Sequence, residues 1–231
     1  RRVEYTAVGH RVFWSNGLEN GVVEDGVNSS WGLREPPRPV VSTVPGELPP
    51  GRYQVVLTYL RADSQESGAS LAVVADVVAG QGLSIALPVP TDTGVVSTRV
   101  FITKADGSIL YHNQTVPAAA TVAVYLFPEE RTSSLQTQFL SPPPPGDFIE
   151  VYNGHALVAV GDRLNFSEPF AYELFDLRKQ LRLGSKITML APVEGGVFAG
   201  TENKVVFLQG ETPDKFDLKG VADYGVIPYT S

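Results

Sequence analysis

The residues best suited to metal binding or general-base chemistry in this sequence are its three histidines, His10, His112 and His155. No two of them stand at the H-x-x-x-H or H-E-x-x-H spacing that places two ligands on one helix face. A zinc site would therefore need ligands from distant parts of the chain. Cysteine is absent, which excludes disulfide bonds and thiolate ligands. The sequence predicts no metal site.

Nucleophilic and acid–base catalysis also lack a recognisable pattern. No G-x-S-x-G motif is present, and VEGGVFAG (193–200) lacks the Lys-Ser/Thr ending of a phosphate-binding loop. The acidic residues are scattered, and two of them could serve a glycosidase only if the fold held them about 5–10 Å apart. We therefore predict no catalytic residues, no cofactor and no enzymatic activity. A hydrolase with converging acids is the third of three hypotheses for the function of the chain.

Two tryptophans are the candidate ligand or partner contacts, because an exposed indole face can stack on a sugar ring or anchor a protein partner. Trp31 lies between Ser30 and Gly32 in an expected loop, which makes it the better candidate. Trp14 stands where a similar segment has Phe166, which favours packing in a core. A carbohydrate-binding module would present such aromatics in an exposed row.

The charge balance restricts the partners. The chain has 18 basic and 25 acidic residues and a formal net charge of −7, which argues against electrostatically driven nucleic-acid binding. The one local exception is a basic cluster, which we interpret as a solvated surface: Arg178, Lys179, Arg182 and Lys186. No apolar run approaches the roughly 20 residues needed to cross a bilayer, so we expect no membrane insertion.

Three similar segments organise the chain. LVAVGDRLNFSEPFAYELFDL (157–177) and VFAGTENKVVFLQGETPDKFDL (197–218) both read strand, turn, strand and end on Phe-Asp-Leu. YTAVGHRVFWSN (5–16) shares the opening of the first of them. The spacing of about 41 residues, with three or four short strands per unit, is typical of a β-propeller blade. A single small sheet cannot cover both of its faces, whereas stacked copies bury them against each other.

A foreign β module separates the first segment from the other two. Strand patterns such as GRYQVVLTYLRAD (51–63) and VVSTRVFITK (95–104) fill the interval, and proline-rich stretches flank it. We predict an all-β fold with four parts: a first propeller-like segment (1–35), a β-sandwich insertion (36–128), a Pro-rich return linker (129–147) and two propeller-like repeats (148–231). SPPPPGDF (141–148) would make the end of that linker stiff.

Two resemblances follow from these segments. GRYQVVLTYLRADSQESGAS and SIALPVPTDTGVVSTRVFITKADGSILY resemble strands of fibronectin type III modules, with the terminal hairpin placed before the middle strands. A permuted or merely immunoglobulin-like sandwich is the alternative. The whole arrangement, including HRVFWSNGLENG and WGLREPP, resembles tailed-bacteriophage virion proteins of the tail or nozzle type, in which a fibronectin-like domain interrupts propeller-like repeats.

The resemblance implies a structural role in a virion tail, with other virion proteins and further copies of the chain as partners. The alternative is a carbohydrate-binding or adhesive module of an extracellular protein, with a surface glycan as partner. A closed propeller has about four or more blades, more than this chain supplies. We expect the remainder to lie in a longer parent chain, since RRVEYTAVGH opens without Met; assembly of blades from several chains is the other possibility.

Overall fold

The computed structural model describes residues 2–92 and 94–228, so that Arg1, Thr93 and residues 229–231 fall outside the description. The predicted all-β class is confirmed. The described residues form nineteen strands in five antiparallel sheets, with a single 3₁₀ turn at Pro213–Lys215. The chain divides into two compact units, one from residues 1–32 and 141–231 and the other from residues 33–140.

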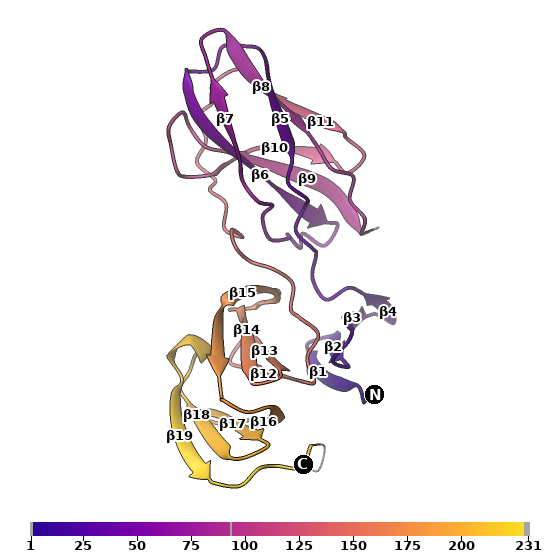
Figure 1. Ribbon diagram of the computed structural model, residues 1–231. Helices are drawn as coiled ribbons and strands as arrows, with labels where there is room; N and C mark the ends of the chain where they lie inside the picture. The colour runs from indigo at the N-terminus through magenta and orange to yellow at the C-terminus, as the bar shows by residue number, and fades with distance from the viewer. Residues whose placement is uncertain (1, 93, 229–231) are drawn as a thin grey trace. The chain divides into compact units, whose positions relative to one another are not determined.

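Unit 1 consists of three four-stranded sheets, each a meander in which consecutive strands are neighbours (Figure 1). The first sheet contains β1 (Glu4–Val8), β2 (Arg11–Ser15), β3 (Asn20–Glu24) and β4 (Val27–Ser29). The second sheet contains β12 (Phe148–Tyr152), β13 (His155–Val160), β14 (Arg163–Glu168) and β15 (Ala171–Arg182). The third sheet contains β16 (Ile187–Val193), β17 (Gly196–Thr201), β18 (Val205–Gln209) and β19 (Asp217–Ala222).

The first hairpin of each sheet is closed by a two-residue loop. In the second sheet the loop is Asn153-Gly154, whose φ angles of 43° and 77° lie in the left-handed region. A two-residue hairpin loop needs positive φ to match the twist of its strands, and Asn-Gly adopts it at low cost. The turn chemistry of the sequence therefore sets the register of the strands.

The sheets of unit 1 are held together at their first strands and through their faces. β1 lies beside β12, and β12 lies beside β16. The core between the first and second sheets contains Phe13 and Val22 from one side and Ala156 and Val158 from the other. Residues of opposite parity in the second sheet build the core with the third sheet, namely Phe148, Leu157, Ala159, Leu164 and Phe166. This alternation of side chains lets one sheet serve two cores.

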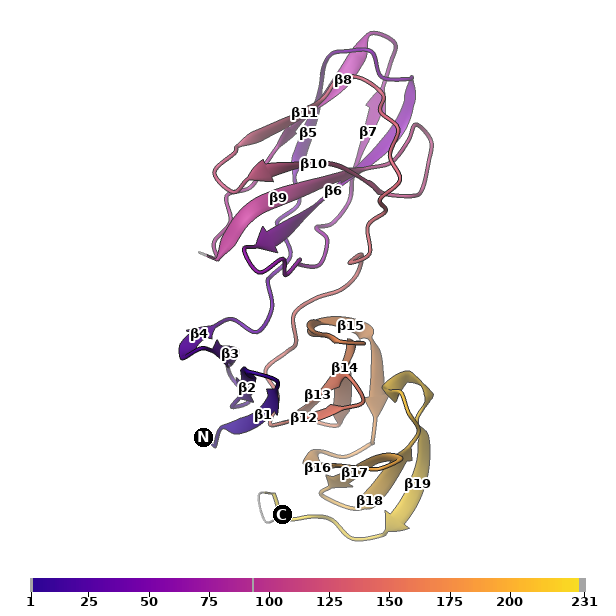
Figure 2. The same cartoon turned by 180° about the vertical axis from the view of Figure 1, so that it is seen from behind.

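Unit 2 is a sandwich of two sheets (Figure 2). The four-stranded sheet has the order β10 (Tyr111–Pro117), β9 (Val95–Ile102), β6 (Gly51–Arg61), β7 (Val73–Val77). The three-stranded sheet has the order β11 (Val122–Tyr125), β8 (Gln81–Ala86), β5 (Val40–Pro45). Their shared core contains Tyr53, Val55, Leu83, Ile85 and Val100 among others.

The segment predicted as a return linker is partly built into both units. The amides of His112 and Leu135 bond the carbonyls of Ser133 and Leu110, so residues 133–135 run along β10. At the other end, Ser141 and Phe175 exchange two backbone hydrogen bonds in unit 1. Residues 129–140 belong to unit 2 and residues 141–147 to unit 1. Because these backbone groups are hydrogen-bonded within the two units, fewer residues form a free linker than the proline-rich sequence suggested.

The sequence alignment of the first segment with the other two is wrong by one strand. The Leu157–Leu177 and Val197–Leu218 segments both begin in the second strand of their sheets, at β13 and β17. The Tyr5–Asn16 segment instead forms β1 and β2, the first hairpin of its sheet. The similarity arises because a two-residue turn between apolar strands has the same sequence pattern wherever it falls in a meander.

Candidate functional site: the outer face of the first sheet

Trp31 is a core residue and does not lie at a surface, contrary to its selection as a ligand contact. Its side chain is only 2% exposed, and its ring centroid lies 4.9 Å from that of Phe13 and 6.4 Å from that of Phe175. The indole Nε1 donates a hydrogen bond of 2.8 Å to the carbonyl oxygen of Tyr172. Trp31 therefore joins the end of the first sheet to the second sheet. Its flanking residues gave no sign of this, because the neighbours that bury it are distant in sequence.

Trp14, which the sequence favoured for a core, is half-buried on the outer face of the first sheet. Its Nε1 donates a hydrogen bond of 2.8 Å to Oδ1 of Asn28. The indole lies against Gly21, where a Cβ would approach Nε1 to 2.6 Å. The glycine in β3 thus makes room for the ring, and the Asn28 contact fixes its orientation.

The outer face around Trp14 is apolar. Tyr5 stands opposite Trp14 across the β1–β2 ladder, and Ala7 stands opposite Val12. Val12 in turn stands opposite Val23 on β3. Tyr5 is 63% exposed and Val12 is 37% exposed. We call these five residues, Tyr5, Ala7, Val12, Trp14 and Val23, the first outer face.

The same positions on the second strands of the other two sheets are buried. In the first sheet, the pair that closes the hairpin loop is Val8–Arg11. The first outer face contains the pairs one and three positions further along the ladder, Ala7–Val12 and Tyr5–Trp14. In the second sheet, one and three steps from the closing pair Tyr152–His155, stand Ala156 and Val158, both 0% exposed against the first sheet.

The third sheet repeats this arrangement. One and three steps from its closing pair Val193–Gly196 stand Val197 and Ala199, both 0% exposed against the second sheet. Equal loops give equal register, so these positions lie on equivalent faces of the three hairpins. The first outer face is therefore the one member of this set that no described sheet covers.

The histidines do not converge. His10 bonds Glu24 at 2.5 Å on the surface of unit 1, and His155 is buried with Nδ1 2.7 Å from the carbonyl oxygen of Ser167. His112 belongs to unit 2, where burial lowers its pKa below the ordinary histidine value. Across residues 2–92 and 94–228, no three His, Asp or Glu side chains are grouped as metal ligands.

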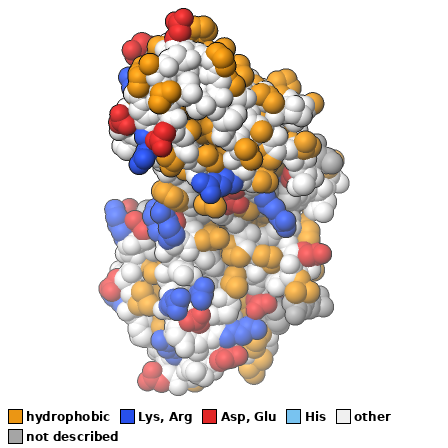
Figure 3. Space-filling view, turned by 45° about the horizontal axis from the view of Figure 1, so that its top comes forward, with side chains coloured by type: hydrophobic (Ala, Val, Ile, Leu, Met, Phe, Trp, Pro, Cys, Tyr) orange, Lys and Arg blue, Asp and Glu red, His pale blue; other side chains and the backbone are white. Residues whose placement is uncertain are grey.

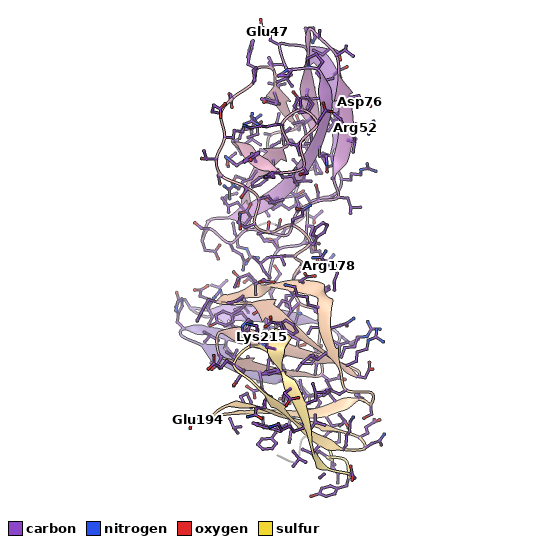
Figure 4. The ribbon with its side chains drawn as sticks, turned by 90° about the vertical axis from the view of Figure 1, so that its left-hand side faces the viewer. Glu47, Arg52, Asp76, Arg178, Glu194 and Lys215 are labelled. Atoms are coloured by element: carbon purple, nitrogen blue, oxygen red, sulfur yellow. The ribbon has the colours of Figure 1, made fainter. Side chains whose placement is uncertain are left out.

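The basic cluster is largely paired with acids. Arg178 bonds Asp176 at 2.8 Å, Lys179 approaches Glu168 at 3.5 Å, and Lys186 approaches Asp147 at 3.2 Å. Arg178 is labelled at the upper part of unit 1 in Figure 4. Figure 3 shows charged side chains of both signs interspersed among apolar ones. The cluster is therefore not an uncompensated anion-binding patch.

A small open hollow in unit 2 is the other surface feature. It lies where the edge strands β10 and β11 approach each other and is lined by Asn113, Gln114, Val124, Tyr125, Leu126, Phe127 and Glu129. Nε2 of Gln114 crosses it to bond the carbonyl oxygen of Val124 at 2.8 Å. The bond ties the two sheets together at their open edge, which gives the Gln114 side chain a structural use.

These features define an all-β protein with a sheet-stacked unit and a sandwich unit. Comparison with known protein families found no family that matches the chain, and comparison with curated proteins found no relative. Among the described residues, no helix is long and apolar enough to pass through a membrane.

Proposed function

We propose that the protein is a non-enzymatic structural component of a phage virion, acting in the tail as one subunit of a larger assembly. Its mechanism is mechanical: rigid β-sheets present faces on which other subunits pack. The finer classes belong to this proposal, namely propeller-like blades for the stacked sheets and a fibronectin type III-like or permuted immunoglobulin-like fold for the sandwich. The inserted position of the sandwich is the organisation that the sequence resemblance implies.

One observation carries the proposal. The first outer face is apolar and exposed, whereas the second-strand counterparts of Val12 and Trp14 in the other two sheets are 0% exposed. Monomeric proteins seldom expose contiguous apolar surface without a binding role. A stable protein interface buries about 800 Å² on each partner, which is of the order that one face of a small sheet can offer.

The sandwich supports the same role. Its core lies between its own two sheets. It bears exposed apolar side chains on β11, Val122 at 52% and Val124 at 49%. A self-contained module of this kind can project from an assembly and dock a neighbour without disturbing the stacked sheets.

The test is to locate the protein in particles. Antibodies raised against the chain should label the tails of purified virions, and mass spectrometry of those virions should find its peptides in fixed proportion to a known tail component. If purified particles lack the chain while the infected-cell lysate contains it, the proposal fails.

A second candidate rests on the Tyr5–Trp14 pair. The two aromatic side chains stand side by side on an exposed face, which is an arrangement that can stack on a sugar ring. A carbohydrate-binding module would bind a glycan array, and Tyr5→Ala would weaken that binding at least tenfold. Absence of any binder on the array would remove this candidate and leave the structural role untouched.

A further inference from the structure

The third sheet also has an outer face that no described sheet covers. Phe198 and Phe207 stand opposite each other there, with ring centroids 4.8 Å apart. Ala191 stands opposite Phe198, and Gly200 stands opposite Val205. We call these five residues, Ala191, Phe198, Gly200, Val205 and Phe207, the third outer face.

One end of this face is extended by the chain that follows β19. The amide of Val226 donates a hydrogen bond of 2.9 Å to the carbonyl oxygen of Thr201. A Cβ on Gly200 would approach Cγ2 of Val226 to 2.7 Å, so the valine lies directly on the glycine. The remainder of the face, including the phenylalanine pair, is left half-buried by the described residues.

The two internal junctions of unit 1 have the same polarity. At the first junction, the Phe13 and Val22 face of the first sheet meets the Ala156 and Val158 face of the second. That first-sheet face is the reverse of its own first outer face, because Phe13 alternates with Val12 and Trp14 along β2. The first sheet therefore meets the sheet after it with the reverse of its first outer face.

The second junction continues the series. Leu157 and Ala159, on the reverse of the second sheet's Ala156 and Val158 face, meet Val197 and Ala199 of the third sheet. It follows that the first outer face is of the kind that receives a preceding sheet. The third outer face is of the kind that is presented to a following sheet. The two free faces are the two halves of one more junction of the same type.

We propose that the third outer face of one copy packs on the first outer face of a second copy, so that the stack of sheets continues from chain to chain. This inference rests on the proposed structural role and names the partner and the surface. The contact is head-to-tail, so it closes into a ring if the rotation per copy divides a full turn and otherwise gives a filament.

The composition of the internal junctions indicates what this contact needs. Each has an apolar centre and a few hydrogen bonds at its margin. At the first junction, Oγ of Ser15 donates to the carbonyl oxygen of Gly146 at 2.7 Å. At the second, the hydroxyl of Tyr152 donates to the carbonyl oxygen of Gly210 at 2.6 Å. Both free faces supply apolar centres, with Tyr5, Trp14 and Asn28 providing polar groups on the receiving side.

A symmetric contact between two third outer faces is less favourable. Lys219 on β19 stands opposite Phe207 and therefore lies on that face. A two-fold contact would place two copies of this lysine in one apolar interface, where like charges and lost hydration both oppose binding. In the head-to-tail contact, each interface contains a single Lys219, with Oδ1 of Asn28 as an acceptor on the receiving face.

The experiment uses two blocking substitutions. Val12→Glu places a charge in the first outer face, and Phe198→Glu places one in the third outer face. Since Phe198 is half-buried, Val193→Glu serves as a second variant. Val193 is two residues from Ala191 on β16, so it lies on the same side of the sheet, and its side chain is 42% exposed. Val74→Glu on β7 of unit 2 is the matched control, since this side chain is 52% exposed and the variant adds the same charge outside both faces. Circular dichroism and thermal unfolding check that each variant folds.

Light scattering after size exclusion gives the readout. The wild-type chain and Val74→Glu should associate as concentration rises, and each blocked variant alone should remain a monomer. An equimolar mixture of Val12→Glu with Phe198→Glu or Val193→Glu should give a one-to-one dimer and nothing larger. The mixture has one intact junction, formed by the third outer face of the Val12→Glu chain and the first outer face of the other.

Three results would overturn the inference. The wild-type chain could stay monomeric throughout, one blocked variant could still dimerise alone through two identical faces, or the mixture could fail to pair. If the chain is found in virion tails but is monomeric in solution, the structural role stands and the docking inference falls. If the dimer forms but particles lack the chain, the reverse holds.

Discussion

The indole of Trp31 donates its hydrogen bond to the carbonyl oxygen of Tyr172, a residue 141 positions later in the sequence. The bond joins the first sheet to the second sheet, although the whole sandwich is inserted between them in the sequence. Ser15 and Gly146 make a second such link, with the Ser15 hydroxyl both donating to the Gly146 carbonyl and accepting from its amide. Unit 1 is therefore one folded body although its two segments are far apart in the chain.

Replacing Trp31 should strongly destabilise unit 1. Trp31→Ala removes a large buried side chain and should lower the free energy of unfolding by about 3–5 kcal/mol. Trp31→Phe keeps most of the packing but leaves the Tyr172 carbonyl unpaired, which costs about 1–3 kcal/mol. Denaturant unfolding followed by fluorescence measures both. Trp14→Phe is the control and should cost less than Trp31→Phe because its bond to Asn28 is exposed; equal losses would contradict the buried position of Trp31.

Gly225 should not tolerate a side chain. A Cβ at this position would collide with the backbone carbonyl of Glu202. Gly225→Ala should therefore detach the segment that carries Val226 and expose more of the third outer face. Hydrogen exchange at the Val226 amide should become faster by at least tenfold. Gly220→Ala is the matched control, since a Cβ there meets nothing within 4 Å, and it should leave that exchange rate unchanged.

Asp176 should make unit 1 sensitive to acid. Its side chain is 5% exposed and accepts hydrogen bonds from Arg178, which hold the pKa of this carboxyl below its ordinary value. A depressed pKa in the folded state contributes stability above the unfolded-state pKa of about 3.9, and this contribution is lost as pH falls through the folded-state value. Thermal unfolding of Asp176→Asn should show a shallower loss of stability below about pH 4; an unchanged acid slope would count against this assignment.

Glu150 should lower the stability of unit 1 at neutral pH rather than in acid. Burial raises the pKa of this side chain on β12 above its ordinary value. A raised carboxyl pKa favours folding at low pH, and that contribution is lost as pH rises through the folded-state pKa. Glu150→Gln, which is uncharged at every pH, should therefore be more stable than the wild type at pH 7. The advantage should vanish in acid. Melting temperatures measured across the acid range check this, and a variant that is less stable at neutral pH would refute it.

A partly buried ion pair is expected to stabilise the sandwich. Glu66 accepts hydrogen bonds from Nη1 of Arg99 at 2.7 Å and from Oγ1 of Thr58 at 2.6 Å. Glu66→Ala leaves the partly buried Arg99 without this acceptor and should cost about 1–3 kcal/mol of unfolding free energy. Arg52→Ala is the control, because both side chains of its ion pair with Asp76 are exposed (Figure 4). This pair should contribute little to the free energy of unfolding. Equal effects in denaturant unfolding would contradict this ranking.

The sequence alone determined the class of fold and most of the strands. Alternating apolar residues in GRYQVVLTYLRAD predicted β6, with Tyr53, Val55 and Leu57 on the face that the sandwich core buries. The Asn153-Gly154 turn specified its hairpin. These features depend on residues close together in the chain, where side-chain alternation and backbone preference act without help from distant partners.

Only the tertiary structure decided which faces are buried. The sequence favoured Trp31 as a ligand or partner contact, but the structure buries it. The sequence favoured Trp14 as a core residue, but the structure leaves it half-exposed. In both cases the deciding neighbours come from another strand or another sheet: Tyr172 and Phe175 cover Trp31, whereas no sheet among the described residues packs on the outer face that carries Trp14. The local pattern of a strand shows that one face is apolar, but burial of that face depends on long-range packing, which no short stretch of sequence encodes.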